Sequence, residues 1–147
     1  MTGSRSDSRF DAFRLSAQEG RIEGSLDARG LDNVADSLAP GDDPVPIAWS
    51  ITGGQSAEGR ASLAIDVSGS VPLTCQRCLG RMDWRVAQAT DVLLAKSERD
   101  LAALDAQSEV EVILAAGPLD PATLVEDELV LTLPFAPRHE GRCPVRE

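Results

Sequence analysis

The middle of the chain alternates apolar and polar residues with the two-residue period of half-buried β-strands. The apolar positions of two such strands are Ile47, Trp49 and Ile51, followed by Ala61, Leu63, Ile65 and Val67. Gly53-Gly54 lies between them, so the pattern predicts a hairpin with its loop at the two glycines. A further strand is expected from Trp84 to about Leu94. The central region is therefore predicted to be a β-sheet.

Similar alternation predicts strands over 13–18, 21–27 and 110–114. Three segments have helical signals instead. Apolar residues from Leu31 to Leu38 form a single stripe that ends before Pro40-Gly41, and Ser97 begins a second short helix. The clearest helix is capped by Asp120, has Pro121 in its first turn and ends before Pro134. Together these elements predict an α+β fold, mainly an antiparallel sheet with a few short helices.

Composition limits the classes of protein that this chain can be. Its 147 residues, 42% of them hydrophobic, suit a single folded domain over residues 10–147 after a flexible start at 1–9. A net charge of −10 opposes nonspecific coating of nucleic acid, and five aromatic residues are too few for a broad base-stacking platform. We expect no membrane-spanning segment, and a cytoplasmic location.

All three cysteines and the single histidine form one candidate metal site. Cys75 and Cys78 have the CxxC spacing, which lets two sulfur atoms face one ion, and Gly80 eases the turn. His139 and Cys143 supply the other two ligands about sixty residues later. This Cys₃His set predicts a structural Zn²⁺ in a knuckle at a hairpin tip, which would hold the later segment against the hairpin.

Two other interpretations of the cysteines stay open. Cys143 lies in a segment bearing glycine and proline, and fraying there would leave Cys75 and Cys78 as an incomplete pair. The CxxC pair is also typical of thiol–disulfide redox centres. Those centres usually lie at a helix N-terminus, whereas this pair lies between predicted strands. The sequence therefore favours zinc over redox chemistry.

Arginines gather around the candidate metal site. The windows 75–86 and 138–147 have a net charge of +3, whereas the rest of the chain has −13. Arginine pairs with phosphates and stacks on bases, so these side chains are candidates for docking on RNA or on a ribonucleoprotein. The alternative is that these arginines compensate the cysteine thiolates or pair with the acidic rest of the protein. The candidate nucleic-acid-binding residues are Arg77, Arg81, Arg85, Arg138 and Arg142.

The chain has few signs of catalysis. It has no glycine-rich phosphate loop, no HExxH motif and no nucleophile elbow, and its one histidine is already a candidate ligand, so we expect no enzyme and no small-molecule substrate. The acidic run Glu126, Asp127 and Glu128 on the last helix is interpreted first as a solvated face. A patch that binds a protein partner is the alternative for these three residues.

Three motifs together resemble the YceD family of large ribosomal RNA subunit accumulation proteins. They are Thr74-Cys-Gln-Arg-Cys-Leu, Val125-Glu-Asp-Glu-Leu-Val-Leu-Thr-Leu-Pro and Pro137-Arg-His. The order of elements is similar to that family over most of residues 10–143. The matching positions are Cys75, Cys78, Glu126, Asp127, Glu128, Pro134, Pro137, His139 and Cys143.

The resemblance implies a non-enzymatic cytoplasmic factor for accumulation of large-subunit ribosomal RNA. On this interpretation the arginine-rich surface beside the zinc site docks on large-subunit rRNA or on a large-subunit ribosomal protein. The alternatives are a thiol redox protein that uses Cys75 and Cys78, or a protein-only adaptor.

Overall fold

The computed structural model describes residues 9–107, 109–134, 136–139 and 143. Most of the flexible start expected at 1–9 therefore lies outside the described residues. In this part of the chain, helices and strands alternate irregularly. The elements are α1 Ala12–Gln18, β1 Arg21–Asp27, the 3₁₀ turn η2 Ala28–Gly30, α2 Asp32–Ala35, β2 Pro46–Gln55, β3 Ala61–Thr74, β4 Arg81–Ala95, α3 Glu98–Gln107, β5 Glu111–Leu114 and α4 Pro121–Thr132.

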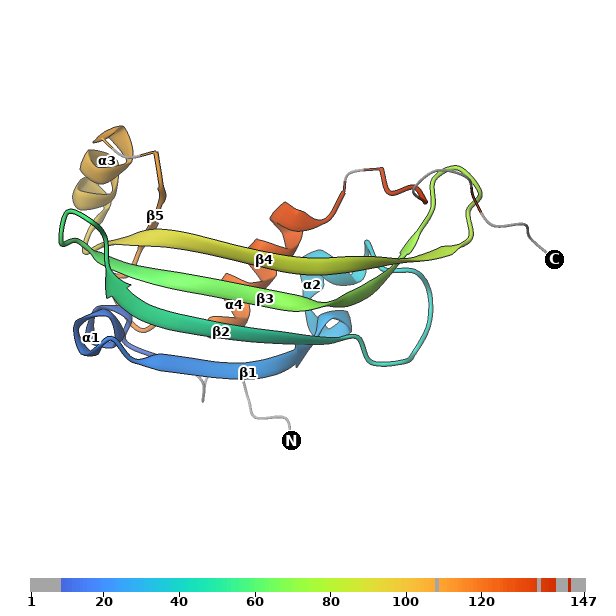
Figure 1. The fold of residues 1–147 in the computed structure, drawn as a ribbon, viewed down its shortest axis with the longest axis horizontal. Coiled ribbons are helices and arrows are strands. Elements are labelled where there is room, and N and C mark those ends of the chain that lie inside the picture. The colour runs from blue at the N-terminus through green and yellow to red at the C-terminus, as the bar shows by residue number, and fades with distance from the viewer. Residues whose placement is uncertain (1–8, 108, 135, 140–142, 144–147) are drawn as a thin grey trace.

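The five strands form one sheet in the order β1-β2-β3-β4-β5 (Figure 1). Neighbours pair antiparallel except β4 and β5, which are parallel, so the predicted α+β architecture with a mainly antiparallel sheet is confirmed. Both α2 and α4 lie behind the sheet in Figure 1, which leaves the other face open. Buried apolar side chains from α4 and the strands form the core between these layers. None of the helices in the described ranges is long and apolar enough to cross a membrane.

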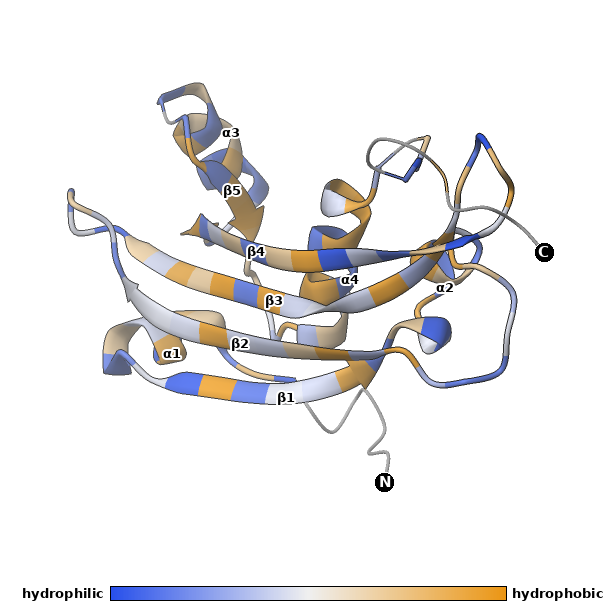
Figure 2. Cartoon of the chain, turned by 45° about the vertical axis from the view of Figure 1, so that its right-hand side comes forward, coloured by the Kyte–Doolittle hydropathy of each residue, from blue (hydrophilic) through white to orange (hydrophobic). Residues whose placement is uncertain are grey.

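The alternation in the strands is visible as coloured bands along β1 and β3 in Figure 2. Ile51 and Ile65 are cross-strand partners, and both are buried on the face that α4 covers. The strands predicted over 21–27 and 84–94 and the helices that begin near Ser97 and Asp120 are confirmed. The helix predicted from Leu31 to Leu38 is shorter, because only Asp32–Ala35 is α-helical.

The strand predicted over 13–18 is wrong, because these residues belong to α1. The side chain of Asp11 accepts a hydrogen bond from the Arg14 backbone N–H and so caps the helix start. Glu19 ends the helix in the left-handed conformation. Ala12 and Ser16, one helical turn apart, are the buried residues. The caps and this four-residue spacing therefore outweigh a two-residue alternation that spans only six residues.

The loop predicted at Gly53-Gly54 is also wrong. Both glycines lie within β2 and pair with β3, and the turn follows at residues 56–60. Gly53 is required there for a packing reason, since a Cβ atom would collide with the backbone of α1 at Leu15 and Ser16. The glycine therefore marks a close approach of helix and strand.

The acidic run on α4 does not form a solvated face. Glu126 and Glu128 are only 8% and 3% exposed, and only Asp127 of the three is exposed. The Glu126 carboxylate accepts a hydrogen bond of 2.7 Å from the backbone N–H of Asn33, at the start of α2. The Thr90 hydroxyl of β4 donates a 2.6 Å hydrogen bond to the Glu128 carboxylate. Two carboxylates of α4 therefore attach this helix to α2 and to the sheet.

Candidate metal centre

Cys75 and Cys78 lie in the connection between β3 and β4, at residues 75–80. The paired strands bring Thr74 opposite Arg81 at the start of this connection. Within it the Cys75 N–H donates to the Gly80 carbonyl at 2.9 Å, and the Leu79 N–H donates to the Cys75 carbonyl at 2.8 Å. Leu79 has a φ of 63°, which closes the turn in the left-handed region. These contacts hold the two cysteine side chains close together.

The segment after α4 runs to the same end of the sheet (Figure 1). Its Pro137 carbonyl accepts a 2.8 Å hydrogen bond from the Gln76 N–H, which fixes the segment against the β3–β4 connection. The Cys75 Sγ then lies 3.7 Å from the Cys143 Sγ. The Cys78 Sγ lies 3.6 Å from the His139 Nδ1. All four candidate ligand atoms lie within 4.8 Å of one another, as the sequence predicted. The zinc knuckle itself stays a prediction.

These spacings fit a tetrahedral ion. Zn–S bonds of about 2.3 Å and a Zn–N bond of about 2.0 Å place two sulfur ligands about 3.8 Å apart, and a sulfur and a nitrogen ligand about 3.5 Å apart. The two measured separations agree with these values. Backbone N–H groups of Arg77 and Gly80 also point at the sulfur atoms of Cys75 and Cys78, each at 3.4 Å. Such donors stabilise thiolate charge around a metal.

The thiols of the cluster differ in acidity. Burial alone raises the pKa of Cys75, but hydrogen bonds from the backbone of Cys78, His139 and Arg77 outweigh it and lower the pKa to about 5. Burial raises the pKa of Cys143, and the neighbouring Cys75 and Cys78 raise it further. The same surroundings therefore favour a thiolate at Cys75 and a protonated thiol at Cys143.

The candidate RNA-binding arginines that the structure describes are exposed, and all but Arg85 lie in or directly beside the segments that hold the cluster. Arg77 donates to the His139 carbonyl at 3.3 Å, which ties the connection to the C-terminal segment again. Arg81 pairs with Asp83 at 3.3 Å on the open face of β4. Arg85 follows on the same strand face, and Arg138 is exposed beside His139. Arg142 lies outside the described residues.

Sequence reasoning missed one feature of this end of the molecule. Leu79 is 67% exposed, although it is apolar and follows the second cysteine of the CxxC pair. The backbone of Leu79 is in the left-handed region, which is unusual for leucine. This conformation could have drawn attention to Leu79, but it cannot be inferred from the residue type. The chain therefore presents a large apolar side chain beside exposed arginines.

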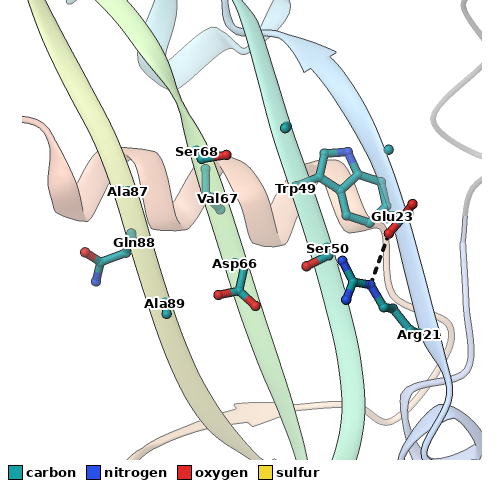
Figure 3. Close-up of a pocket in the computed structure, with 12 residues that line it drawn as sticks. Arg21, Glu23, Trp49, Ser50, Asp66, Val67, Ser68, Ala87, Gln88 and Ala89 are labelled. Carbon is teal, nitrogen blue, oxygen red and sulfur yellow. Dashed lines mark hydrogen bonds and ion pairs between the residues drawn. The ribbon is translucent and has the colours of Figure 1, made fainter.

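A second concave region lies away from the cluster, on the open face of the sheet. This hollow has a volume of about 720 Å³ and is lined by residues of β1 to β4. Figure 3 shows these strands, with α4 behind them. Small and polar side chains such as Ser50, Ser68 and Ala89 line it, and the Arg21–Glu23 ion pair of 3.0 Å lies at one side. No cysteine or histidine of the candidate metal centre reaches it.

Comparison with known proteins concerns the half of the chain that contains the candidate metal centre. A family model described as "Large ribosomal RNA subunit accumulation protein YceD" matches residues 63–147, whereas the resemblance inferred from the sequence began at residue 10. No curated protein and no solved structure matches the chain. The matched region is more than half of the chain and includes most of β3, all of β4 and α4, and all four residues of the cluster. The chain therefore belongs to the YceD family.

Proposed function

We propose that this protein is a non-enzymatic cytoplasmic factor that supports accumulation of large-subunit ribosomal RNA and assembly of the large ribosomal subunit. The observation that carries the proposal is the family match over the half of the chain that holds the cluster. The cluster joins two segments more than sixty residues apart, and both of them bear exposed arginines. We infer that the joined surface docks on large-subunit rRNA or on a ribosomal protein bound to it.

Zinc is the ion proposed for the cluster. Cys75, Cys78, His139 and Cys143 would hold it, and the ion would supply a cross-link between the β3–β4 connection and the C-terminal segment. We expect about one zinc per chain in the reduced, purified protein, measured by elemental analysis. Cys75→Ser should lose most of this zinc, whereas the neighbouring exposed Gln76→Ser should keep it. Metal-free protein with three freely reactive thiols would contradict the zinc site.

Local charge supports an RNA-related partner. Among the described residues of 75–86 and 138–143, four arginines (Arg77, Arg81, Arg85 and Arg138) accompany one acidic residue, Asp83. Asp43 lines the same hollow as Arg81 and adds one more acidic side chain nearby. Three thiolates around one Zn²⁺ add a single negative charge, so the surface stays positive on an otherwise acidic protein. Such a confined basic surface orients a phosphate-rich partner without general nucleic-acid binding.

Only one of the three acidic residues of α4 is proposed to bind a protein partner. Asp127 is the exposed member, so it is the one proposed to contact a protein partner. Glu126 and Glu128 use their carboxylates to hold α4 in place. We propose that these two position the exposed side of α4 without contacting the partner.

The test is the ratio of large- to small-subunit rRNA in source cells depleted of the protein. Wild type should restore the ratio, and Arg81→Glu/Arg138→Glu should fail because it reverses two charges beside the cluster. A matched control is Arg60→Glu/Arg99→Glu, which reverses two exposed arginines remote from the cluster in sequence. An unchanged ratio after depletion would reject the rRNA role. Full rescue by the cluster variant would instead favour a protein-only adaptor.

The redox alternative has a separate readout. Thiol–disulfide exchange by Cys75 and Cys78 requires a disulfide that cycles during function. Thiol trapping in growing cells should find both cysteines reduced if they hold zinc. A substantial fraction of Cys75–Cys78 disulfide would favour the redox function.

A further inference from the structure

Within the described ranges, the outer edge of β4 is largely unpaired. β4 has 15 residues, but β5 pairs only with Val92–Ala95. Over residues 81–91 the strand pairs with β3 on one side, and no backbone hydrogen bond reaches its other side from any described residue. Figure 1 shows this edge as the boundary of the sheet between the β3–β4 connection and β5. An open edge of this length is a template for another strand.

This edge has few of the devices that normally block strand pairing. Proline, charged side chains (lysine above all) and bulges are common protections of an edge. Residues 81–91 contain no proline, glycine or lysine and pair with β3 without a bulge, and their charged side chains are of both signs: Arg81, Asp83, Arg85 and Asp91. The opposite edge strand, β1, is only seven residues long and contains Gly24. The sequence therefore leaves β4 able to pair.

We propose that β4 of a second copy of this chain pairs antiparallel with this edge, about a two-fold axis at Trp84. This register pairs residues 81–87 of each copy. It places Asp83 of each copy opposite Arg85 of the other on the open face of the sheet. On the face covered by helices, the partly exposed Trp84 lies opposite Trp84, whereas Met82 and Val86, which also lie opposite each other, are already buried within each copy. Opposite charges and large apolar side chains are favourable direct cross-strand partners.

Neighbouring registers are less favourable. A two-fold axis at Asp83 places Arg81 opposite Arg85, and an axis at Arg85 places that arginine opposite itself, so both bring like charges together. An axis at Val86 brings residue 92 of one copy beside residue 80 of the other. In that register β5 of the first copy, which begins to pair with β4 at Val92, would collide with the β3–β4 connection of the second copy. The axis at Trp84 avoids both problems.

Exposed apolar residues near the same edge support a second copy as the occupant. Val130 and Leu131 of α4 are 46% and 68% exposed. Figures 1 and 2 both show the C-terminal end of α4 extending past β4, on the side where a second copy would lie. A two-fold axis perpendicular to the sheet puts both α4 helices on the same face. Each copy would then cover apolar side chains that are now exposed.

Sedimentation of RNA-free protein over a wide concentration range tests the proposal independently of the ribosomal role. We expect a reversible monomer–dimer equilibrium for wild type. Asp83→Arg and Arg85→Asp each create two like-charge contacts across the axis, and each should raise the dissociation constant at least about tenfold. The double variant Asp83→Arg/Arg85→Asp should restore it to within about threefold of wild type. Circular dichroism checks that each variant is folded.

Asp91→Arg is the matched control, since Asp91 is exposed on the same strand face but lies outside the paired residues 81–87. It makes the same change in charge as Asp83→Arg and should leave the dimer unchanged. A monomer at every concentration would overturn the proposal and leave the edge to a strand of another protein. Equal weakening by Asp91→Arg, or no restoration in the double variant, would overturn it too.

Discussion

The hydrogen bond between Thr90 and Glu128 allows a quantitative test of how α4 is attached to the sheet. Thr90→Val keeps the shape of the side chain but removes the hydroxyl that donates at 2.6 Å. Glu128 is only 3% exposed, so water has little access to replace the lost donor. A hydrogen bond to a charged group contributes about 1.5–3 kcal/mol, and a buried acceptor left alone costs a similar amount. We expect the free energy of unfolding to fall by about 2 kcal/mol.

A second substitution separates the hydrogen bond from other effects of the change. Glu128→Met has a similar side-chain length and no charge, so Thr90→Val/Glu128→Met leaves no buried carboxylate without a donor. The double variant should recover most of the stability lost in Thr90→Val. Thr123→Val on the exposed side of α4 is the control and should change stability by less than about 0.5 kcal/mol.

Urea unfolding, followed by the fluorescence of the two tryptophans and by circular dichroism, measures these differences. Coincident transitions from the two signals would justify a two-state treatment. The expected loss in Thr90→Val corresponds to a fall in melting temperature of roughly 4–8 °C for a domain of this size. The reasoning is refuted if Thr90→Val unfolds like wild type, or if the double variant is no more stable than Thr90→Val.

Three further substitutions test other contacts by unfolding measurements. Gly53→Ala should lower the free energy of unfolding by about 1–3 kcal/mol because the added methyl group meets the backbone of α1. Gly54→Ala, whose nearest neighbour is 4.0 Å away, should lower it far less. Equal effects of the two substitutions would contradict this account. Glu126→Ala should cost about 1 kcal/mol, since the Asn33 N–H loses its acceptor, and an unchanged stability would show that water replaces the cap. Partial burial of the exposed Asp127 side chain, and then the charge of Glu126, raise the pKa of Asp127, so the ionised carboxylate opposes folding above its usual pKa. Asp127→Asn should therefore stabilise by up to about 0.5 kcal/mol at pH 7, with a gain that disappears as the pH falls and wild-type Asp127 takes up its proton.

The sheet and the cluster were largely predictable because their signals are periodic or chemically rare. Strand alternation located β2, β3 and β4, and the spacing of the cysteines located half of the cluster. Asp120 was identifiable as the cap of α4 because capping depends on residues adjacent in sequence. Features determined locally, or by scarce residue types, could therefore be predicted.

The wrong predictions depended on contacts between distant parts of the chain. Nothing near Gly53 in the sequence shows that α1 packs onto it. The partners of Glu126 and Glu128 lie 93 and 38 residues away, so an acidic run that looks solvated is in fact mostly buried. The parallel pairing of β5 with β4 was missed for the same reason, since strand direction follows from the connection through α3.

The separation of the cluster's two halves affects the order of folding. Cys75 and Cys143 are 68 positions apart, and closing a loop of that length costs about 4 kcal/mol of chain entropy. Pairing of β3 with β4 is local and brings Cys75 and Cys78 together early, whereas His139 and Cys143 can join them only after α4 has docked. Tight metal binding would therefore be a late step in folding. The kinetics of metal uptake would then report when the last long-range contacts of the domain have formed.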